Sequence, residues 1–141
     1  MRLTALFFAI AAFLNQNAPA PDNQGILRAY LEKGAPFNLF LIDVRGSSEI
    51  TAAIGTSDCK PYNFAWPAQL KILSGKIPKD AVIFIYCQSG GRAAQAAGYL
   101  KESGYLHVYD AGGINTWTGP TVSREGIKSA SLLPEPSMRG K

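Results

Sequence analysis

One short segment combines a nucleophile with backbone features that could activate it. Cys87 follows the apolar residues 81–86 and precedes two adjacent glycines, Gly90 and Gly91, and then Arg92. Adjacent glycines let the backbone curl, so that several amide N–H groups point at one spot. A helix that begins here adds the positive end of its dipole, and Arg92 adds a fixed positive charge. These features favour the thiolate form of Cys87, which would attack an electrophilic sulfur or phosphorus atom.

The residues on either side of Cys87 predict a strand–loop–helix unit. Residues 81–86 are mostly β-branched or aromatic, which is typical of a buried strand. From Ala93 the pattern becomes helical, with Leu100 on the same face, and Gly104 is suited to end the helix. A buried, unreactive cysteine before a glycine-rich turn would leave a similar pattern. The combination of strand, cysteine, paired glycines, arginine and helix favours a functional site.

Strands and helices are expected to alternate along the rest of the chain. The patterns predict a helix at 24–33, an apolar strand at 39–42 and a helix that begins at Pro67. The other expected elements are a loop with at most one helical turn at 46–61, short strands at 62–64 and 107–109, and a turn at Gly112–Gly113. This alternation indicates an α/β fold with a parallel sheet between two helical layers, α/β/α.

Length and composition exclude several classes of protein. A chain of 141 residues predicts one main domain, and 47% apolar with 17% charged residues suits a globular core rather than disorder. The net charge of +4 is spread along the chain without basic runs, so we expect no nucleic-acid partner. Two cysteines and one histidine do not supply a zinc or multi-histidine centre, so we expect neither a metal nor another cofactor.

The first twenty residues have the layout of a secretory signal peptide. Arg2 supplies a positive start, an uncharged and mostly apolar stretch runs over 3–14, and Ala18 and Ala20 occupy the positions that a signal peptidase reads. We therefore expect residues 1–20 to direct export, most simply to a bacterial periplasm; an N-terminal core helix is the alternative. Residues 21–120 would then form the domain, and the polar, proline-containing residues 121–141 a flexible tail.

Three motifs, in order, give the chain a resemblance to single-domain rhodaneses, a family of sulfurtransferases. The resemblance covers residues 24–119 and depends on three segments of the sequence. These are Leu41-Ile42-Asp43-Val44-Arg45 with Glu49, Tyr86-Cys87-Gln88-Ser89-Gly90-Gly91-Arg92 with Ala93, and Val108-Tyr109 followed by Gly112-Gly113-Ile114 and Trp117.

The resemblance implies a fold, a reaction and a set of site residues. It implies a rhodanese-like fold with a parallel sheet of about five strands, and a catalytic Cys87 that takes a sulfane sulfur from a donor such as thiosulfate. The resulting persulfide would pass its sulfur to cyanide or to a thiol. Asp43 and Arg45 would lie near the loop, as supporting residues or as a structural ion pair. The loop whose amides would stabilise the persulfide is Gln88, Ser89, Gly90, Gly91 and Arg92, with Arg92 also helping to hold it.

Loop length and two departures from the family pattern bear on the substrate. Four residues separate Cys87 from Arg92, whereas related phosphatases and arsenate reductases have five, and the smaller loop suits a single sulfur. Gln88 stands where many members carry a basic residue, which weakens attraction for a dianionic donor. After its first motif the family usually has a Gly-His-Ile-Pro-Gly-Ala-like segment. Residues 53–59 take its place here, without the histidine and ending in Cys59.

The second cysteine leaves alternatives open. Cys59 could accept sulfur from Cys87 or form a disulfide with it, which would make the chain a thiol redox protein, or it could be an unpaired loop cysteine. A further alternative is a sulfur-carrier or binding module with little turnover that serves an exported protein partner. Small donors and thiol or cyanide acceptors are the partners that the leading hypothesis requires.

Overall fold

A parallel β-sheet forms the centre of the fold in the computed structural model, which describes residues 21–133. The order of its strands is β3-β1-β4-β5, and every pairing between them is parallel. The strands are β1 (Leu39–Asp43), β3 (Tyr62–Asn63), β4 (Val82–Cys87) and β5 (His107–Gly113). Within residues 21–133 the sheet thus has four strands where the resemblance implied about five. Two other short strands, β2 (Ala52–Ile54) and β6 (Thr121–Ser123), pair with each other in a separate antiparallel ribbon.

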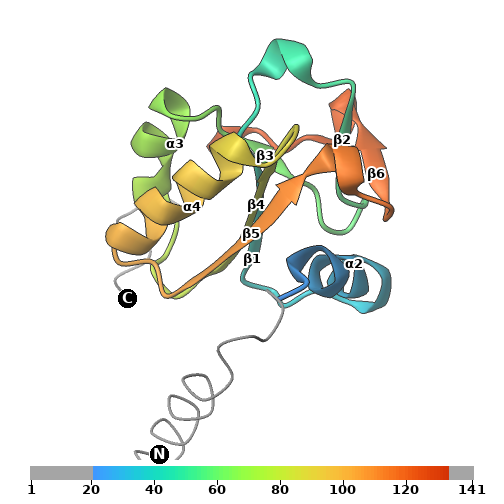
Figure 1. Cartoon of the computed structure of the whole chain (residues 1–141), viewed down its shortest axis with the longest axis horizontal. Coiled ribbons are helices and arrows are strands. Elements are labelled where there is room, and N and C mark those ends of the chain that lie inside the picture. Colours follow the sequence, from blue (N-terminus) through green and yellow to red (C-terminus); the bar gives the residue numbers. More distant parts are fainter. Residues whose placement is uncertain (1–20, 134–141) are drawn as a thin grey trace, which may run out of the picture.

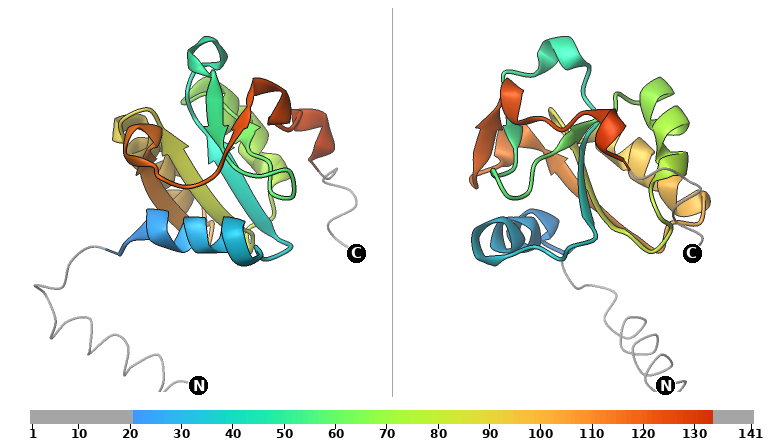
Figure 2. Two further views of the ribbon diagram at one scale, coloured as in Figure 1. Left: turned by 90° about the vertical axis from the view of Figure 1, so that its right-hand side faces the viewer. Right: turned by 180° about the vertical axis from the view of Figure 1, so that it is seen from behind.

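Helices cover both faces of the sheet, which confirms the predicted three-layer α/β/α architecture. Helix α2 (Asn23–Lys33) lies on one face, while α3 (Ala68–Leu73) and α4 (Gly91–Glu102) lie on the other (Figures 1 and 2). Short 3-10 turns complete the described chain: η1 (Ser47–Glu49), η2 (Ser74–Lys76), η3 (Ile114–Thr116), η4 (Arg124–Gly126) and η5 (Ala130–Leu132). None of the helices within residues 21–133 is long and apolar enough to cross a membrane.

The side chains of β4 divide between the two helical layers. Ile83, Ile85 and Cys87 pack in the cluster that contains α4, whereas Phe84 and Tyr86 pack in the cluster that contains α2. This alternation follows from the two-residue period of a strand whose two faces are both buried. It places Cys87 at the carboxyl end of a central strand, on the α4 side of the sheet.

The domain extends beyond the predicted boundary at residue 120. Strand β6 pairs with β2 in the register Ala52↔Ser123 and Ile54↔Thr121, and Leu133 is buried in the α4-side core. The expectation of a flexible tail from residue 121 is therefore wrong for 121–133, because backbone pairing and apolar burial hold this segment on the domain. Residues 134–141 and the expected signal peptide, 1–20, lie outside the described residues.

Candidate active site

Two backbone amides hold the sulfur of Cys87. Strand β4 ends at Cys87, and α4 begins at Gly91 after a turn in which Gly90 has φ of 112°. The N–H groups of Gly90 and Ala93 donate to Cys87 Sγ at 3.0 and 3.4 Å. Both come from the start of a helix, where amides have no partner in the preceding turn and carry the positive end of the dipole. The loop is therefore built to hold negative charge on sulfur.

The thiol lies beneath the loop rather than at its surface. Cys87 is 1% exposed, whereas Gln88, Ser89 and Gly91 are exposed. The side chains of the loop thus form the outer rim of the site, and its backbone forms the inner wall. A reagent that reaches this sulfur must present a terminal atom to it.

The carboxyl end of β5 packs against the backbone of the loop. Gly113 pairs with Cys87, and the N–H of Asn115 donates to the carbonyl of Gln88 at 3.1 Å. A Cβ atom at Gly113 would lie 2.4 Å from Gln88 O and 2.7 Å from Ser89 Cα, so no larger residue fits there. The predicted turn at Gly112–Gly113 is therefore wrong: β5 continues through these glycines because the loop backbone packs directly against them.

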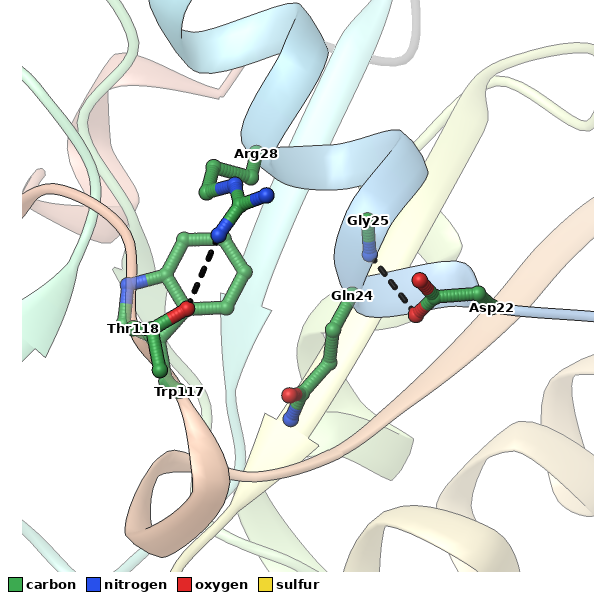
Figure 3. Close-up of a pocket in the computed structure, with 6 residues that line it drawn as sticks. All are labelled: Asp22, Gln24, Gly25, Arg28, Trp117 and Thr118. Atoms are coloured by element: carbon green, nitrogen blue, oxygen red, sulfur yellow. Dashed lines mark hydrogen bonds between the residues drawn. The ribbon is translucent and has the colours of Figure 1, made fainter.

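Helix α2 fixes this end of β5 in turn. Gln24 Nε2 donates to the carbonyls of Ala111 and Gly113 at 2.8 and 3.0 Å. Gln24 also lines a polar pocket of about 180 Å³ at the start of α2, across which Arg28 Nη1 donates to Thr118 Oγ1 at 2.9 Å (Figure 3). The side chain of Gln24 thus connects the helix that precedes β1 to the strand that carries the loop.

Asp43 and Arg45 form a buried ion pair at the carboxyl end of β1. Arg45 Nη2 lies 2.7 Å from Asp43 Oδ2, Nε donates to both carboxylate oxygens at 3.0 and 3.1 Å, and the two side chains are 3% and 0% exposed. Burial opposes the charge of Arg45, but the carboxylate of Asp43 outweighs it and raises the pKa of Arg45.

The ion pair also contacts the loop and strand β2. Arg45 donates from Nη2 to Ala52 O at 2.9 Å and from Nη1 to Gln88 Oε1 at 3.3 Å. Asn63 Nδ2 donates to the carbonyls of Asp43 and Arg45 and fixes the backbone between them. Of the two readings of Asp43 and Arg45, the structure shows the ion pair, with one contact to the rim of the site.

Arg92 points to a carboxylate outside the loop. Its Nη1 and Nη2 donate to Glu49 Oε2 and Oε1 at 2.8 and 2.9 Å, and Gly46 N donates to Glu49 Oε2 at 2.9 Å. The hydrogen bond from Arg92 and the one from Gly46 lower the pKa of Glu49 to about 2. The same contact with Glu49 raises the pKa of Arg92. Arg92 therefore ties the start of α4 to η1.

Acid is expected to weaken the protein through Glu49. Its pKa of about 2 in the folded protein lies below the ordinary value of 4.5, so unfolding takes up a proton between these two values. The stabilisation is complete above about pH 4.5 and is lost as the pH falls toward 2. We expect the E49Q variant to show a flatter dependence of Tm on pH across this window, measured by circular dichroism from pH 2 to 6.

The R92Q variant serves as the partner control. It removes the cation and leaves Glu49 in place, so it should flatten the same part of the curve. Wild-type and E49Q curves that run parallel from pH 2 to 4.5 would contradict the assignment to this pair.

Cys59 lies away from the site, and both cysteines are free thiols. It packs in the cluster on the α2 side and lines a pocket with Leu39, at the start of β1, whereas Cys87 lies on the α4 side at the carboxyl ends of the strands. Burial raises the pKa of the Cys59 thiol. The structure thus shows two free thiols on opposite sides of the sheet rather than a Cys59–Cys87 disulfide.

Sequence reasoning missed four parts of this arrangement. Ala93 supplies an amide to the sulfur, Glu49 pairs with Arg92, and Gly113 and Asn115 support the loop. The sequence singled out some of these residues but did not show what they do. Glu49 and Gly113 belong to the quoted motifs, and Ala93 is the third residue of a helix whose first amides are unpaired. Within residues 21–133 no group of three or more His, Cys, Asp or Glu side chains could hold a metal ion.

Comparison with known proteins gives one consistent result. A family profile described as “Rhodanese-like domain” matches residues 23–119. A protein of Allochromatium vinosum named “Sulfurtransferase” is 36% identical over 94 residues, which cover 63% of this chain and 83% of that protein. The “Thiosulfate sulfurtransferase PspE” of Escherichia coli is 39% identical over 44 residues, 31% of this chain and 42% of that protein.

A solved structure extends the likeness to three dimensions. The “30 kDa Polysulfide-sulfur Transferase Homodimer” of Wolinella succinogenes aligns with a TM-score of 0.54 at 25% identity. The alignment covers 84% of this chain and 88% of that one. All three names include the transfer of sulfur, and two of them name a donor, thiosulfate in one case and polysulfide in the other.

Proposed function

The chain belongs to the family of rhodanese-like domains, and from this premise we propose that it is a sulfurtransferase whose Cys87 carries the transferred sulfur as a persulfide. The observation that carries the proposal is the position of Cys87 Sγ, which accepts hydrogen bonds from the Gly90 and Ala93 amides. Because these amides are in place before the reaction, they can stabilise negative charge that develops on sulfur without having to move. Sulfurtransferase names among the relatives support the same reaction class.

The first half of the reaction loads Cys87. The Cys87 thiolate attacks the outer sulfur of a sulfane donor such as thiosulfate, a new S–S bond forms, and the donor's own S–S bond breaks. Sulfite leaves with the electron pair of that bond, and the protein keeps a persulfide anion. The Gly90 and Ala93 amides hold the Cys87 sulfur during this step, and the other loop amides, from Gln88 to Arg92, would hold the added sulfur.

The second half returns Cys87 to its starting state. Cyanide attacks the outer persulfide sulfur and leaves as thiocyanate, or a thiolate attacks it and leaves as a new persulfide. In both cases the S–S bond to Cys87 breaks, and its electrons return to the Cys87 thiolate. No external oxidant or reductant is needed.

Intact-mass spectrometry tests the proposal. The reduced, purified protein is incubated separately with excess thiosulfate and with the persulfide of a neutral thiol, and cyanide is then added. We expect a gain of one sulfur, about 32 Da, that cyanide removes and that the C87S variant does not show. The C59S variant should gain the sulfur as wild type does, because Cys59 lies on the other face of the sheet.

The outcomes separate the hypotheses. No added sulfur from either donor, on protein shown to be folded, would overturn the proposed function. One sulfur per chain that cyanide removes, without repeated turnover when donor and cyanide are both in excess, would instead assign the sulfur-carrier module. A gain on C87S would move the reaction to Cys59.

We propose further that residues 1–20 direct the protein to the bacterial periplasm, where its donor, acceptor and any protein partner would be found. The basic start, the apolar stretch and the small residues at positions 18 and 20 support this. Fractionation of expressing cells should place the processed chain in the periplasm. Full-length protein in the cytosol would contradict the proposal.

A further inference from the structure

Two arginines flank the loop, and each already has a carboxylate partner. Arg45 Nη2 lies 2.7 Å from Asp43, and Arg92 Nη1 lies 2.8 Å from Glu49. Neither guanidinium therefore offers an uncompensated positive charge to a substrate. The arginine that contacts the rim, Arg45, does so through the neutral side chain of Gln88.

Two lysines that could attract an anionic donor make other contacts. Lys60 lines the pocket beside Leu39, at the start of β1 and thus toward the opposite end of the strands from Cys87. Lys71 lies over the rings of Trp66 and Tyr99, 5.3 Å from each ring centre. The amides of Gly90 and Ala93 contact the sulfur directly, and amides fixed in this way suffice for the single charge of a thiolate or persulfide.

From these contacts we infer that the physiological donor is a thiol persulfide rather than thiosulfate, and that Gln88 sets this preference. Thiosulfate brings two negative charges to a thiolate, and each of the two arginines that flank the loop is already paired with a carboxylate. A persulfide of a neutral thiol carries at most one. The exposed position of Gln88 above a 1%-exposed Cys87 puts its side chain where the remainder of the donor must lie. The inference rests on the proposed function and narrows its donor.

The loading step with this donor balances without a co-reactant. The Cys87 thiolate attacks the outer sulfur of R–S–SH, so that the S–S bond of Cys87 forms as the S–S bond of the donor breaks. R–S⁻ leaves with the electron pair and takes up the persulfide proton. The products are the Cys87 persulfide anion and the thiol R–SH.

A lysine at position 88 tests the inference. We expect Q88K to raise the ratio of kcat/KM for thiosulfate to kcat/KM for the persulfide of 2-mercaptoethanol about tenfold over wild type. Q88M is the matched control, because it also loses the contact with Arg45 but adds no charge, and its ratio between the two donors should equal that of wild type.

Ionic strength gives a second readout. In wild type, salt screens the repulsion between thiosulfate and the thiolate, so kcat/KM for thiosulfate should rise between about 0.01 and 0.15 M salt. Q88K should show a smaller rise or a fall, and the neutral-thiol persulfide should change little with either protein.

Each result decides the inference. The inference requires that wild type prefer the persulfide by kcat/KM and that Q88K raise the ratio of the thiosulfate value to the persulfide value. Failure of either result overturns the donor assignment and leaves the sulfurtransferase proposal standing. If wild type loads sulfur from neither donor, the proposed function itself is overturned.

Discussion

The G113A variant is expected to lose about 100-fold in the proposed sulfur transfer. The added Cβ would lie 2.4 Å from Gln88 O and 2.7 Å from Ser89 Cα, distances that real Cβ contacts do not show. Because both atoms belong to the loop backbone, the loop itself must move by about 1 Å, which is the scale of misplacement that costs an enzyme about two orders of magnitude. Steady-state kcat/KM with thiosulfate and cyanide measures the loss.

The same contact should also cost stability, because Gly113 is buried and the added methyl overpacks its site. We expect a loss of about 1–3 kcal/mol in the free energy of unfolding, measured by urea denaturation. G98A is the matched control: Gly98 is an exposed position in α4 where a new Cβ meets nothing within 4 Å, so activity should stay unchanged and the helix should gain about 0.5–1 kcal/mol. Wild-type activity in folded G113A would refute this role of Gly113.

The strand–loop–helix unit around Cys87 was predictable because its determinants are local. The apolar run of β4, the two glycines and the helical period of α4 are contiguous, and the structure has β4 at Val82–Cys87 and α4 at Gly91–Glu102. The same holds for α2, expected at 24–33 and found at Asn23–Lys33. In these segments propensity and burial pattern favour the same element.

Features built from distant segments escaped prediction. Strand β2 is three residues long and pairs with β6, which lies in the segment that composition assigned to a tail. Neither strand carries a signal of its own, since each is too short to show a period. The role of Glu49 depends likewise on Arg92, 43 positions away. Motif order indicated that these residues matter, but only the fold brings them together.

The D43N variant is expected to show the largest loss of stability, about 3–5 kcal/mol. Asn keeps the size of Asp43 and removes its charge, which leaves the guanidinium of Arg45 3% exposed and without its carboxylate. Breaking a buried ion pair from one side costs this much because the remaining charge has lost both water and partner. At roughly 4 °C per kcal/mol for a domain of this size, Tm should fall by about 12–20 °C.

A double-mutant cycle separates the charge from the hydrogen bonds around it. R45M removes the cation and keeps an apolar side chain of similar length, so D43N/R45M buries no lone charge and should unfold at lower free-energy cost than the sum of the two single losses. Urea denaturation of the four proteins at neutral pH measures the coupling between the two side chains. Strictly additive losses would show that Asp43 and Arg45 act independently. A coupling above about 1 kcal/mol would show that the two side chains stabilise the carboxyl end of β1 as a unit, at the point where Arg45 also contacts Gln88 of the loop.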